Sequence, residues 1–463
     1  MRKSSVPGTG DFCYTVRMTM PLPFCCPGPV ETTDFSISTV GSPTLKSPIR
    51  GQRFIEPSHH VSVFTDLREI RSWHDRNLEA PSLERAGPRE SIFHDPAWTR
   101  VGIVTCGGLC PGLNNVIKGL VQVLWFDYGV RNIYGIPYGY RGLNPAYAHT
   151  PLILTPELVD SIHEDGGTIL GSSRGDQDPS IMVDTLMRLN INVLFTVGGD
   201  GTLRGAHAIV EELAKRNQRI SVVGVPKTID NDLNLVDRTF GFETAVYSAA
   251  EVITNAHIEA RGAFNGLSIV KLMGRDSGFI AAYASLANTV VNLCLVPEQP
   301  FALEGDGGLL KALEKRFSKG KTHAVLVVAE GAGQDLFKGL PEQRDASGNL
   351  LHNDIGDLLV AQCKDHFKKI GTELNVRYFD PSYTIRSGPA RGTDAIFCYQ
   401  LAENAVHAAM AGKTDMVVGA WFGQFTHVPI SLAICERKKI DITGPLWNAV
   451  TSATRQQDYF QQK

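Results

Sequence analysis

Residues 220–232 read ISVVGVPKTIDND, an apolar run followed by a cluster of polar side chains. The apolar run predicts a buried strand that ends at its proline. In an open parallel sheet, the carboxyl ends of the strands face the crevice where ligands bind. The sequence therefore predicts that a cation (Lys227), a hydroxyl (Thr228) and two carboxylates (Asp230 and Asp232) face one small volume. Pairs of acids also occur in ordinary turns and helix caps, so the neighbouring motifs decide between a site and a turn.

The composition is that of an ordinary globular protein. The chain has 463 residues, enough for two domains, with 43% hydrophobic and 20% charged residues. Its net charge of −3 gives no reason to expect nucleic acid or an anionic membrane as a partner. No apolar run is long enough to cross a bilayer. The nine cysteines are scattered and odd in number, which favours reduced cytosolic thiols over a disulfide framework or a zinc site.

Residues 1–96 differ from the rest of the chain. Residues 1–50 are rich in Ser, Thr, Pro and Gly, which predicts that most of them are disordered or loosely attached. A helical turn or two is expected over 63–77, where apolar residues recur at helical spacing. The basic start faintly resembles an organelle transit sequence, and a flexible cytosolic extension is the simpler interpretation.

From residue 100 onward, a strand, a glycine turn and a helix follow one another. The strand is predicted over 101–105, the turn over 106–112 and the helix over 113–126. This order is typical of the first unit of a phosphate-binding α/β fold. The turn matches neither G-x-G-x-x-G nor a Walker A sequence. Gly108 could therefore contact a phosphate, or the turn could only bring the strand close to the helix.

A second glycine-rich segment, residues 166–175, reads GGTILGSSRG. Its small residues allow the backbone to approach a ligand closely. Arg174, followed by Gly175, is placed to clamp a polyphosphate. The alternative interpretation is an arginine in a surface loop.

The turn GGDGT (198–202) follows a short helix over 183–189 and a strand over 193–197, and a helix is expected over 203–216. Its glycines remove side chains where a nucleotide would lie. Asp200 could cap the helix. In a phosphate site it would instead hold Mg²⁺, because a hard cation needs an anionic oxygen beside the phosphates. Several unrelated kinases of small molecules and lipids also use GGDGT.

Four arginines lie at the ends of predicted elements: Arg174, Arg275, Arg377 and Arg386. Arg275 closes the strand over 267–272, which follows a helix over 245–261, and Glu330 closes the strand over 323–329. A single arginine usually faces solvent. Four of them at element ends, in a chain with net negative charge, suggest two anionic ligands rather than one.

Seven motifs occur in order along the chain: GGLCPGLN (107–114), LGSSRG (170–175), GGDGT (198–202), PKTIDND (226–232), MGR (273–275), EG (330–331) and YTIR (383–386). Each motif alone is unspecific, but together they resemble those of the phosphofructokinases, type A. The resemblance covers roughly residues 98–440 and leaves the N-terminal extension outside. The combination of motifs looks most like the ATP-dependent members from plants and kinetoplastid protists.

The resemblance implies transfer of the γ-phosphoryl group of ATP to the 1-hydroxyl of fructose 6-phosphate, a step of glycolysis, with Mg²⁺ as cofactor. It implies that Asp230 is the proton acceptor, that Arg275 and Lys227 also take part in catalysis, and that Asp200 binds the metal. The ATP-binding residues that it implies are Gly108, Arg174, Gly175, Gly199, Asp200, Gly201 and Thr202. The sugar-phosphate residues that it implies are Thr228, Ile229, Asp230, Asp232, Met273, Gly274, Arg275, Glu330, Arg377, Tyr383, Thr384, Ile385 and Arg386, with Arg377 reaching the 6-phosphate from a neighbouring subunit.

Two positions bear on whether ATP or pyrophosphate is the donor. The pyrophosphate enzymes resemble GGDD with a lysine before TIDND, and the bacterial ATP enzymes resemble GGDG with a glycine there. This chain combines Gly201 of the ATP kind with Lys227 of the pyrophosphate kind. An aspartate at 201 would intrude on the α-phosphate of a nucleotide, so Gly201 favours ATP. Around Gly266 the chain lacks an arginine that bacterial members use on the 6-phosphate across a subunit interface.

Other functions fit the motifs less well. A pyrophosphate-dependent enzyme is the closest alternative. An NAD or lipid kinase shares GGDGT but gives no account of MGR or YTIR, and a dehydrogenase lacks its G-x-G-x-x-G. A regulatory subunit that binds sugar phosphates without turnover would be marked by loss of Asp200, Gly201 or Asp230, and all three are present.

The expected fold is α/β, with two Rossmann-like domains, largely parallel sheets and the active site in the cleft between them. The expected ATP-binding domain is 97–246 plus about 385–435, and the fructose 6-phosphate-binding domain is 247–384 plus about 436–463, with 1–96 as a partly disordered extension. The resemblance also implies a homotetramer, control by an allosteric small molecule and a cytoplasmic location. Targeting to an organelle through the extension is the alternative.

Overall fold

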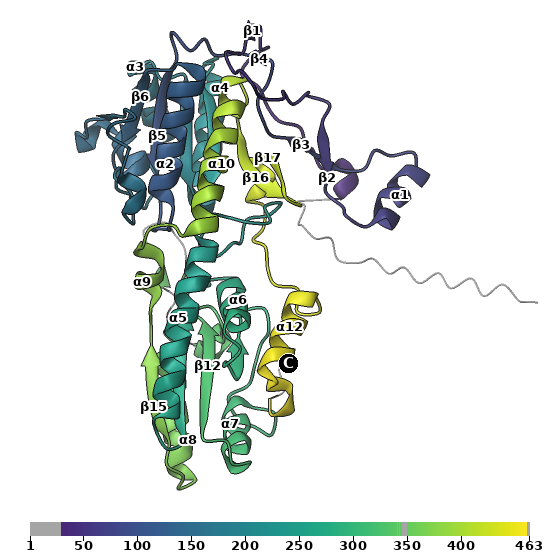
Figure 1. Cartoon of the computed structure of the whole chain (residues 1–463), viewed down its shortest axis with the longest axis vertical. Helices are drawn as coiled ribbons and strands as arrows, with labels where there is room; N and C mark the ends of the chain where they lie inside the picture. Colours follow the sequence, from purple (N-terminus) through teal and green to yellow (C-terminus); the bar gives the residue numbers. More distant parts are fainter. Residues whose placement is uncertain (1–28, 340, 342, 345–349, 461–463) are drawn as a thin grey trace, which may run out of the picture.

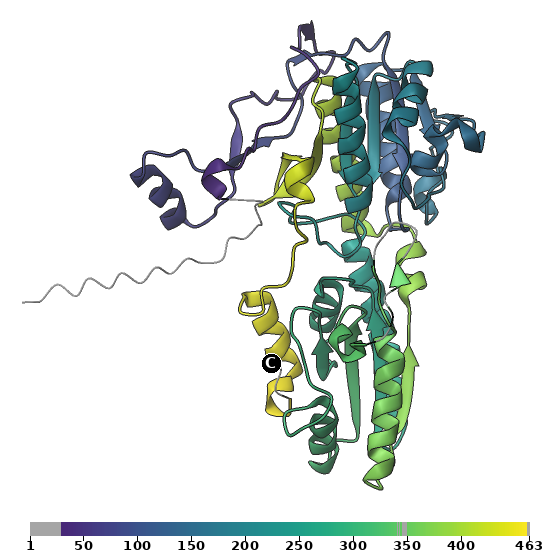
Figure 2. The same cartoon turned by 180° about the vertical axis from the view of Figure 1, so that it is seen from behind.

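The computed structural model of this chain describes residues 29–339, 341, 343–344 and 350–460. These residues form two lobes stacked along the long axis of the molecule (Figure 1), and Figure 2 shows the same lobes from behind. Each lobe is a sheet with helices on both faces, which agrees with the expected α/β fold. Among the described residues, no helix combines the length and the apolar character that a membrane span needs.

The upper lobe is built on one sheet that contains nine strands of the described chain. The five central strands run parallel and the strands at both edges are antiparallel. In spatial order the strands are β2 (His60–Ser62), β3 (Ser82–Arg85), β17 (Gln424–Pro429), β16 (Met416–Trp421), β9 (Ser221–Pro226), β8 (Val193–Gly198), β5 (Arg100–Thr105), β6 (Asn132–Ile136) and β7 (Leu152–Ile153).

Helices cover both faces of the upper sheet because successive side chains of each strand point to opposite faces. In β5, Ile103 joins the hydrophobic cluster under α2 and α10, whereas Val104 joins the cluster under α3 and α4. The four helices are α2 (Leu113–Gln122), α3 (Pro179–Arg188), α4 (Asp200–Lys215) and α10 (Gly392–Met410).

The lower lobe has a parallel sheet whose four described strands are β11 (Leu293–Leu295), β12 (His323–Ala329), β10 (Gly266–Leu272) and β15 (Asn375–Phe379), in that spatial order. Five helices of the described chain cover this sheet, three on one face and two on the other. The first, second and fifth of them in chain order share one face, and the third and fourth cover the opposite face. In chain order these helices are α5 (Phe242–Arg261), α6 (Phe279–Ala287), α7 (Leu309–Ser318), α8 (Ile355–Lys369) and α12 (Pro445–Thr454).

One hydrophobic cluster runs through both lobes. Phe195 of β8, Phe242 at the start of α5 and Val270 of β10 all belong to it. The chain enters the lower lobe through α5, returns through α9 (Ser382–Ser387) and crosses again after α11 (Ile430–Ala433). The lobes are therefore joined by three passes of the chain and a shared core, which fixes the walls of the space between them.

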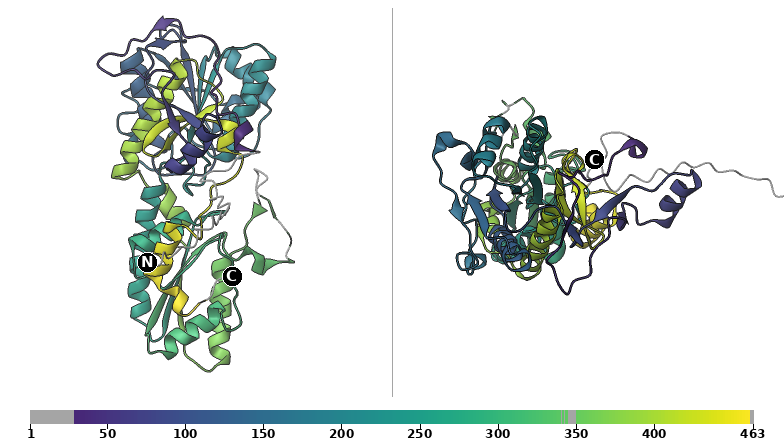
Figure 3. Two further views of the ribbon diagram at one scale, coloured as in Figure 1. Left: turned by 90° about the vertical axis from the view of Figure 1, so that its right-hand side faces the viewer. Right: turned by 90° about the horizontal axis from the view of Figure 1, so that it is seen from above.

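Part of the predicted N-terminal extension belongs to the upper lobe. Residues 1–28 lie outside the described residues, so the expectation of disorder is tested only beyond them. There, β2 and β3 extend the sheet beside β17, and β1 (Leu45–Lys46) pairs with β4 (Ser91–Ile92). Helix α1 (Leu67–Asp75) lies within the expected 63–77, and Figure 3 shows its segment extending away from the upper lobe.

A buried ionic cluster attaches this N-terminal segment to the sheet. Glu84 of β3 accepts hydrogen bonds from Arg89 Nη2 at 2.6 Å and from Lys413 Nζ at 2.8 Å. His427 Nδ1 of β17 lies 3.5 Å from the same carboxylate. Glu84, Arg89 and His427 are all buried. The segment is thus tied to the upper lobe by charge pairing as well as by strand pairing.

Two helix boundaries differ from the sequence-based expectation. Helix α4 begins at Asp200 rather than at Leu203, and Gly199 takes the N-cap position without a side-chain bond. The predicted helix over 113–126 is α2 followed by a π-helical segment, Val123–Tyr128. The earlier start of α4 matters most, because it puts Asp200 inside the first helical turn and so excludes it as the cap.

Candidate active site

A cleft of about 840 Å³ lies between the two lobes. Its upper wall is formed by the turns that follow β5, β8 and β9, and its lower wall by the turns that follow β10 and β12 together with α9. These turns are at the carboxyl ends of parallel strands, where α/β sheets bind ligands. Most of the predicted site residues line this cleft: Gly108, Arg174, Gly175, Gly199, Asp200, Gly201, Thr202, Lys227, Thr228, Ile229, Asp230, Asp232, Met273, Arg275, Glu330, Tyr383 and Arg386.

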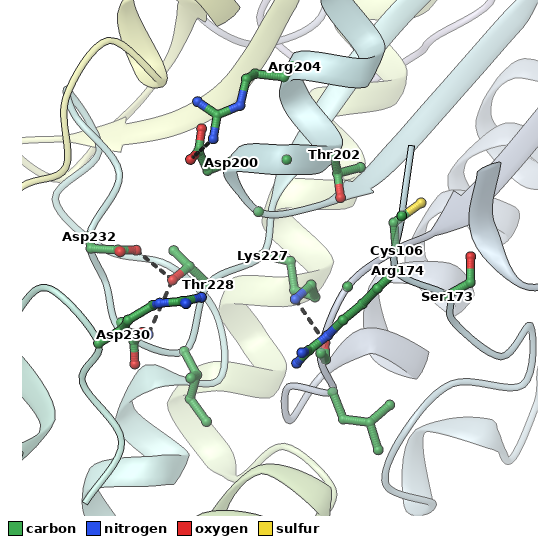
Figure 4. Close-up of a pocket in the computed structure, with 18 of the residues that line it drawn as sticks. Cys106, Ser173, Arg174, Asp200, Thr202, Arg204, Lys227, Thr228, Asp230 and Asp232 are labelled. Atoms are coloured by element: carbon green, nitrogen blue, oxygen red, sulfur yellow. Dashed lines mark hydrogen bonds and ion pairs between the residues drawn. The ribbon is translucent and has the colours of Figure 1, made fainter. Parts of the chain in front are cut away.

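The two carboxylates after β9 have different surroundings (Figure 4). Asp232 is buried, and its Oδ1 accepts a hydrogen bond from Thr228 Oγ1 at 2.6 Å. Asp230 Oδ1 has no hydrogen-bond partner among the described residues. Burial, and then the charges of Asp232 and Glu330, raise the pKa of Asp230 well above that of an ordinary aspartate. Asp230 is thus a stronger base than an ordinary aspartate, and one of its oxygens is left for a ligand.

Asn231 fixes the turn between the two aspartates. It has a left-handed backbone, with φ of 55°, which asparagine tolerates better than most residues. Its side chain holds this turn, because Nδ2 donates to Asp237 O at 3.0 Å and Oδ1 accepts from Thr239 N at 2.9 Å. Asp230 and Asp232, on either side of this fixed turn, both line the cleft.

Three cations gather at the glycine turn after β5. Lys227 is buried, and its Nζ donates to Gly108 O at 2.8 Å. A Cβ built on Gly108 would lie 3.6 Å from Arg174 Nη2 and 3.7 Å from Arg386 Nη1. Burial lowers the pKa of Lys227. Guanidinium groups and an ammonium around a bare backbone turn are suited to a polyphosphate.

The glycines of GGDGT have two different roles. A Cβ on Gly198 would lie 2.1 Å from Thr202 Oγ1, so the fold itself requires glycine there. A Cβ on Gly201 would meet no heavy atom within 4 Å, so the space beside it is open. Tyr140 holds the first turn of α4 in place, because its hydroxyl donates to Thr202 O at 2.5 Å.

Asp200 is the residue best suited to a metal. Its side chain forms an ion pair with Arg204, one helical turn away, while its Oδ1 is buried without a hydrogen-bond partner among the described residues. Burial raises its pKa. The described residues contain no group of three or more His, Cys, Asp or Glu that would hold a metal without other ligands. One carboxylate beside phosphates is the usual setting of Mg²⁺, so the arrangement fits that ion.

The lower wall contains a charged group that the motifs did not predict. Lys271 Nζ lies 2.6 Å from Asp354 Oδ2 and 2.9 Å from Asp380 Oδ2. Burial opposes the charge of Lys271, but these two partners raise its pKa. Burial also raises the pKa of Glu330, and the positive charges of Lys271 and Arg275 reduce this rise. In the sequence, this group could have been found from Lys271, the one charged residue in the mostly apolar strand over 267–272.

Four predicted residues do not line the cleft. Gly274 serves the turn, since its φ is +134° and a Cβ there would lie 2.6 Å from Ser277 O. Ile385 is buried, and Thr384 lies beside it in α9. Arg377 is 49% exposed on β15 and pairs with Glu259 at 3.8 Å. A single chain therefore does not bring Arg377 to the site.

Sequence reasoning missed several residues of the cleft: Cys106, Tyr140, Met182, Arg204, Ala208, Lys271, His352, Asp380 and Arg437. Arg437 is the least expected, because it comes from the last crossing between the lobes and belongs to no motif. Its guanidinium lies within 4 Å of three carboxylates.

Comparison with known proteins gives consistent matches. The sequence profile of the phosphofructokinase family matches residues 100–409. The ATP-dependent 6-phosphofructokinase of Borreliella burgdorferi is 46% identical over 438 residues, which cover 92% of this chain and 97% of that protein. ATP-dependent 6-phosphofructokinase 7 of Arabidopsis thaliana is 46% identical, over 81% of this chain and 77% of that protein.

A solved structure supports the fold. The pyrophosphate-dependent phosphofructokinase of Marinobacter aquaeolei superposes with a TM-score of 0.61 and 19% identity, covering 79% of this chain and 92% of that one. At this identity the likeness concerns the fold alone. It agrees with two α/β lobes around a cleft.

Proposed function

This chain belongs to the phosphofructokinase family, and we propose that its cleft transfers the γ-phosphoryl group of ATP to the 1-hydroxyl of fructose 6-phosphate. The products are fructose 1,6-bisphosphate and ADP. The observation that carries this function is the pairing of an open position at Gly201 with an Asp230 oxygen that has no partner among the described residues. The first leaves room for a nucleotide, and the second is a base aimed at the acceptor.

The upper wall binds the donor. The phosphates lie along the turns at Gly108 and Gly199–Thr202, where backbone N–H groups and the cations of Arg174 and Lys227 meet them. The apolar part of the cleft, lined by Tyr140, Met182 and Ala208, takes the adenine. Asp200 holds Mg²⁺, which neutralises phosphate charge when it is bound.

The lower wall binds the acceptor. Arg386 and Tyr383 of α9, with Met273, Arg275 and Glu330, hold the sugar phosphate, and Thr228, Ile229 and Asp232 border it from above. Asp230 accepts the proton of the 1-hydroxyl. Charge on the transferring group spreads over its equatorial oxygens, so the cations Arg275 and Lys227 stabilise it and the base needs mainly to be well placed.

A donor assay tests this function. Purified protein should phosphorylate fructose 6-phosphate with ATP and Mg²⁺, and chelation of the metal should stop the reaction. Asp230→Asn should lower kcat by about 10² to 10⁴ while ATP still binds, because only the base is lost. Activity with pyrophosphate alone would reject ATP as the donor and favour the second candidate, a pyrophosphate-dependent enzyme, for which Lys227 is the supporting observation.

The domain roles follow from the same assignment. We assign ATP binding to 97–246 with about 385–435, and sugar-phosphate binding to 247–384 with about 436–463. The described strands before residue 97 support a wider upper domain that also includes β2 and β3.

We also propose a cytoplasmic homotetramer controlled by an allosteric small molecule. The exposed position of Arg377 supports a site that is completed by a neighbouring subunit. Five buried cysteines of the described residues, Cys106, Cys110, Cys294, Cys363 and Cys398, form no disulfide, which supports a reducing compartment. Imaging of the full chain and of a truncation at about residue 90 separates the cytoplasm from an organelle.

A further inference from the structure

Arg437 connects the two walls of the cleft. Its Nη1 lies 2.7 Å from Asp276 Oδ2 and 3.3 Å from Asp232 Oδ2, and its Nη2 lies 3.8 Å from Asp200 Oδ2. Asp200 and Asp232 follow strands β8 and β9 of the upper lobe, whereas Asp276 follows β10 of the lower lobe. One guanidinium therefore bridges carboxylates from both lobes.

The backbone beside Arg437 is fixed to the same two lobes. The Lys438 N–H donates to Asp232 O at 2.8 Å, in the upper wall. Two residues later, the Ile440 N–H donates to Glu298 Oε1 at 2.9 Å, in the lower lobe. These bonds anchor the segment on each side of its crossing, so the position of the guanidinium is determined by both lobes at once.

The contact with Asp232 continues to the catalytic base. Asp232 Oδ2 receives Arg437, and its Oδ1 accepts the Thr228 hydroxyl at 2.6 Å. The Thr228 oxygen in turn accepts the Asp230 N–H at 3.3 Å. A chain of hydrogen bonds thus runs from Arg437 to the backbone of Asp230.

The three carboxylates around Arg437 also require a cation between them. Asp200, Asp232 and Asp276 surround Arg437, which is 28% exposed, so their mutual repulsion is only partly screened by water. The planar guanidinium can reach several carboxylates in fixed directions, whereas an ammonium has no such fork.

We propose that Arg437 is a positioning residue for the phosphoryl transfer, which holds Asp232 against Asp276 and so fixes Thr228 and the backbone of Asp230 relative to the lower wall. This role rests on the function proposed above. As a positioning residue, Arg437 acts through Asp232 and Asp276 and touches neither ATP nor fructose 6-phosphate.

The test compares Arg437→Ala, Arg437→Lys and Asp276→Asn in the full chain. Arg437→Ala should lower kcat by about 10²-fold, the usual cost of a misplaced catalytic group, with both KM values changed less than about threefold. Arg437→Lys should recover part of kcat. Asp276→Asn should lower kcat in the same way, and the double variant should be no worse than Arg437→Ala alone, because both residues act in one unit.

A second readout does not depend on turnover. Hydrogen exchange at the Asp230 amide should become faster in Arg437→Ala and in Asp276→Asn. In both variants the Thr228 hydroxyl, which accepts the hydrogen bond of this amide, is no longer held in place. Lys439→Ala removes an exposed cation from the same segment and serves as the matched control, with wild-type kcat and exchange expected.

The outcomes separate this inference from the proposed function. A wild-type protein that does not phosphorylate fructose 6-phosphate with ATP would reject the function itself. With an active wild type, normal kcat in Arg437→Ala would overturn the positioning role. So would a normal Asp276→Asn beside an impaired Arg437→Ala, which would place Arg437 on a substrate. If Arg437→Ala does not fold, Arg437→Lys and Asp276→Asn carry the same test.

Discussion

At position 201 a side chain would point into the cleft rather than into the protein, since a Cβ there has no heavy atom within 4 Å. At position 198 the reverse holds, because a Cβ would lie 2.1 Å from Thr202 Oγ1. Two glycines of one motif are thus required for different reasons. Gly198 is required because a larger residue would collide with the Thr202 side chain, whereas Gly201 leaves open the space in which we propose that the donor binds.

Gly201→Asp should lower kcat/KM for ATP by about 10²-fold or more, a loss of roughly 2.7 kcal/mol of transition-state stabilisation, because the new carboxylate meets the nucleotide phosphates. The melting temperature should stay at the wild-type value. Steady-state kinetics and a thermal melt measure both. Gly198→Ala is the matched control, with a lower melting temperature expected. An unchanged kcat/KM in Gly201→Asp would show that position 201 does not select the donor.

Lys227→Ala should lower turnover more than it weakens ATP binding. Lys227 Nζ lies at the turn where the phosphates would sit, 2.8 Å from Gly108 O, and its charge matters most when charge develops on the transferring group. The comparison is between kcat and the dissociation constant for ATP from calorimetry. Lys227→Met, which keeps the buried stem, controls for packing. Wild-type turnover in Lys227→Ala would make the lysine a bystander.

Much of the site could be predicted from short motifs, and its exceptions have physical reasons. Gly108, Asp200 and Asp230 come within a few residues of the ends of β5, β8 and β9, so strand prediction alone brings them together. Arg437 could not be found in this way, because its place depends on how a late crossing segment packs. Arg377 lies outside the cleft of the single chain, and its predicted contact with the 6-phosphate stays a prediction.

Strand β3 is attached partly by charge, through Glu84. Burial would raise the pKa of Glu84, but His427 and Lys413 lower it to about 2. Since the folded pKa lies below the unfolded value of 4.5, the carboxylate stabilises the fold above about pH 4.5. This contribution is lost as the pH falls from there towards 2. Glu84 therefore contributes more to the attachment of β3 at neutral pH than in acid.

Glu84→Gln should reduce the free energy of unfolding by about 3 kcal/mol at pH 7, because it leaves Arg89 and Lys413 without their partner. The difference from wild type should shrink as the pH falls below 4.5. Urea unfolding at several pH values measures it. Glu251→Gln, which removes an exposed pair with Arg391, is the control and should cost less than about 1 kcal/mol. Equal losses in the two variants would contradict a special role for Glu84.

The elements that were predicted well are those with strong local signals. The strand over 323–329 is a run of apolar and β-branched residues, and β12 has these bounds. Strands β2 and β3 are short, and their pairing depends on β17, which lies far away in the sequence. Helix α4 was predicted to begin three residues late, because glycine in its first turn lowers helix propensity.

At the scale of the whole molecule, we expect copies of the chain in the proposed tetramer to meet over exposed apolar side chains on α5 and α10. Ile258 is 60% exposed and Ile396 is 63% exposed. Arg377, on β15, pairs with Glu259, which follows Ile258 on α5. A neighbouring subunit on this side would both cover apolar surface and come close to Arg377.

Light scattering should give a mass four times that of the 50.5 kDa chain. Ile258→Glu combined with Ile396→Glu should reduce this mass and raise KM for fructose 6-phosphate, because a shared site is lost. Ile153→Glu, at a residue that is 64% exposed on β7, controls for surface charge and should leave both unchanged. A fully active monomer would count against shared sites.

The two sheets differ in how much of the chain must be synthesised before all their strands are present. The lower sheet uses residues 266–379 only, a continuous stretch. The upper sheet needs β16 and β17, residues 416–429, to cover the open edge of β9. During synthesis on a ribosome, the lobe that comes second in the sequence can therefore complete its sheet first. The nascent upper lobe waits with an unpaired edge, the state in which growing chains aggregate most readily and in which chaperones should be needed most.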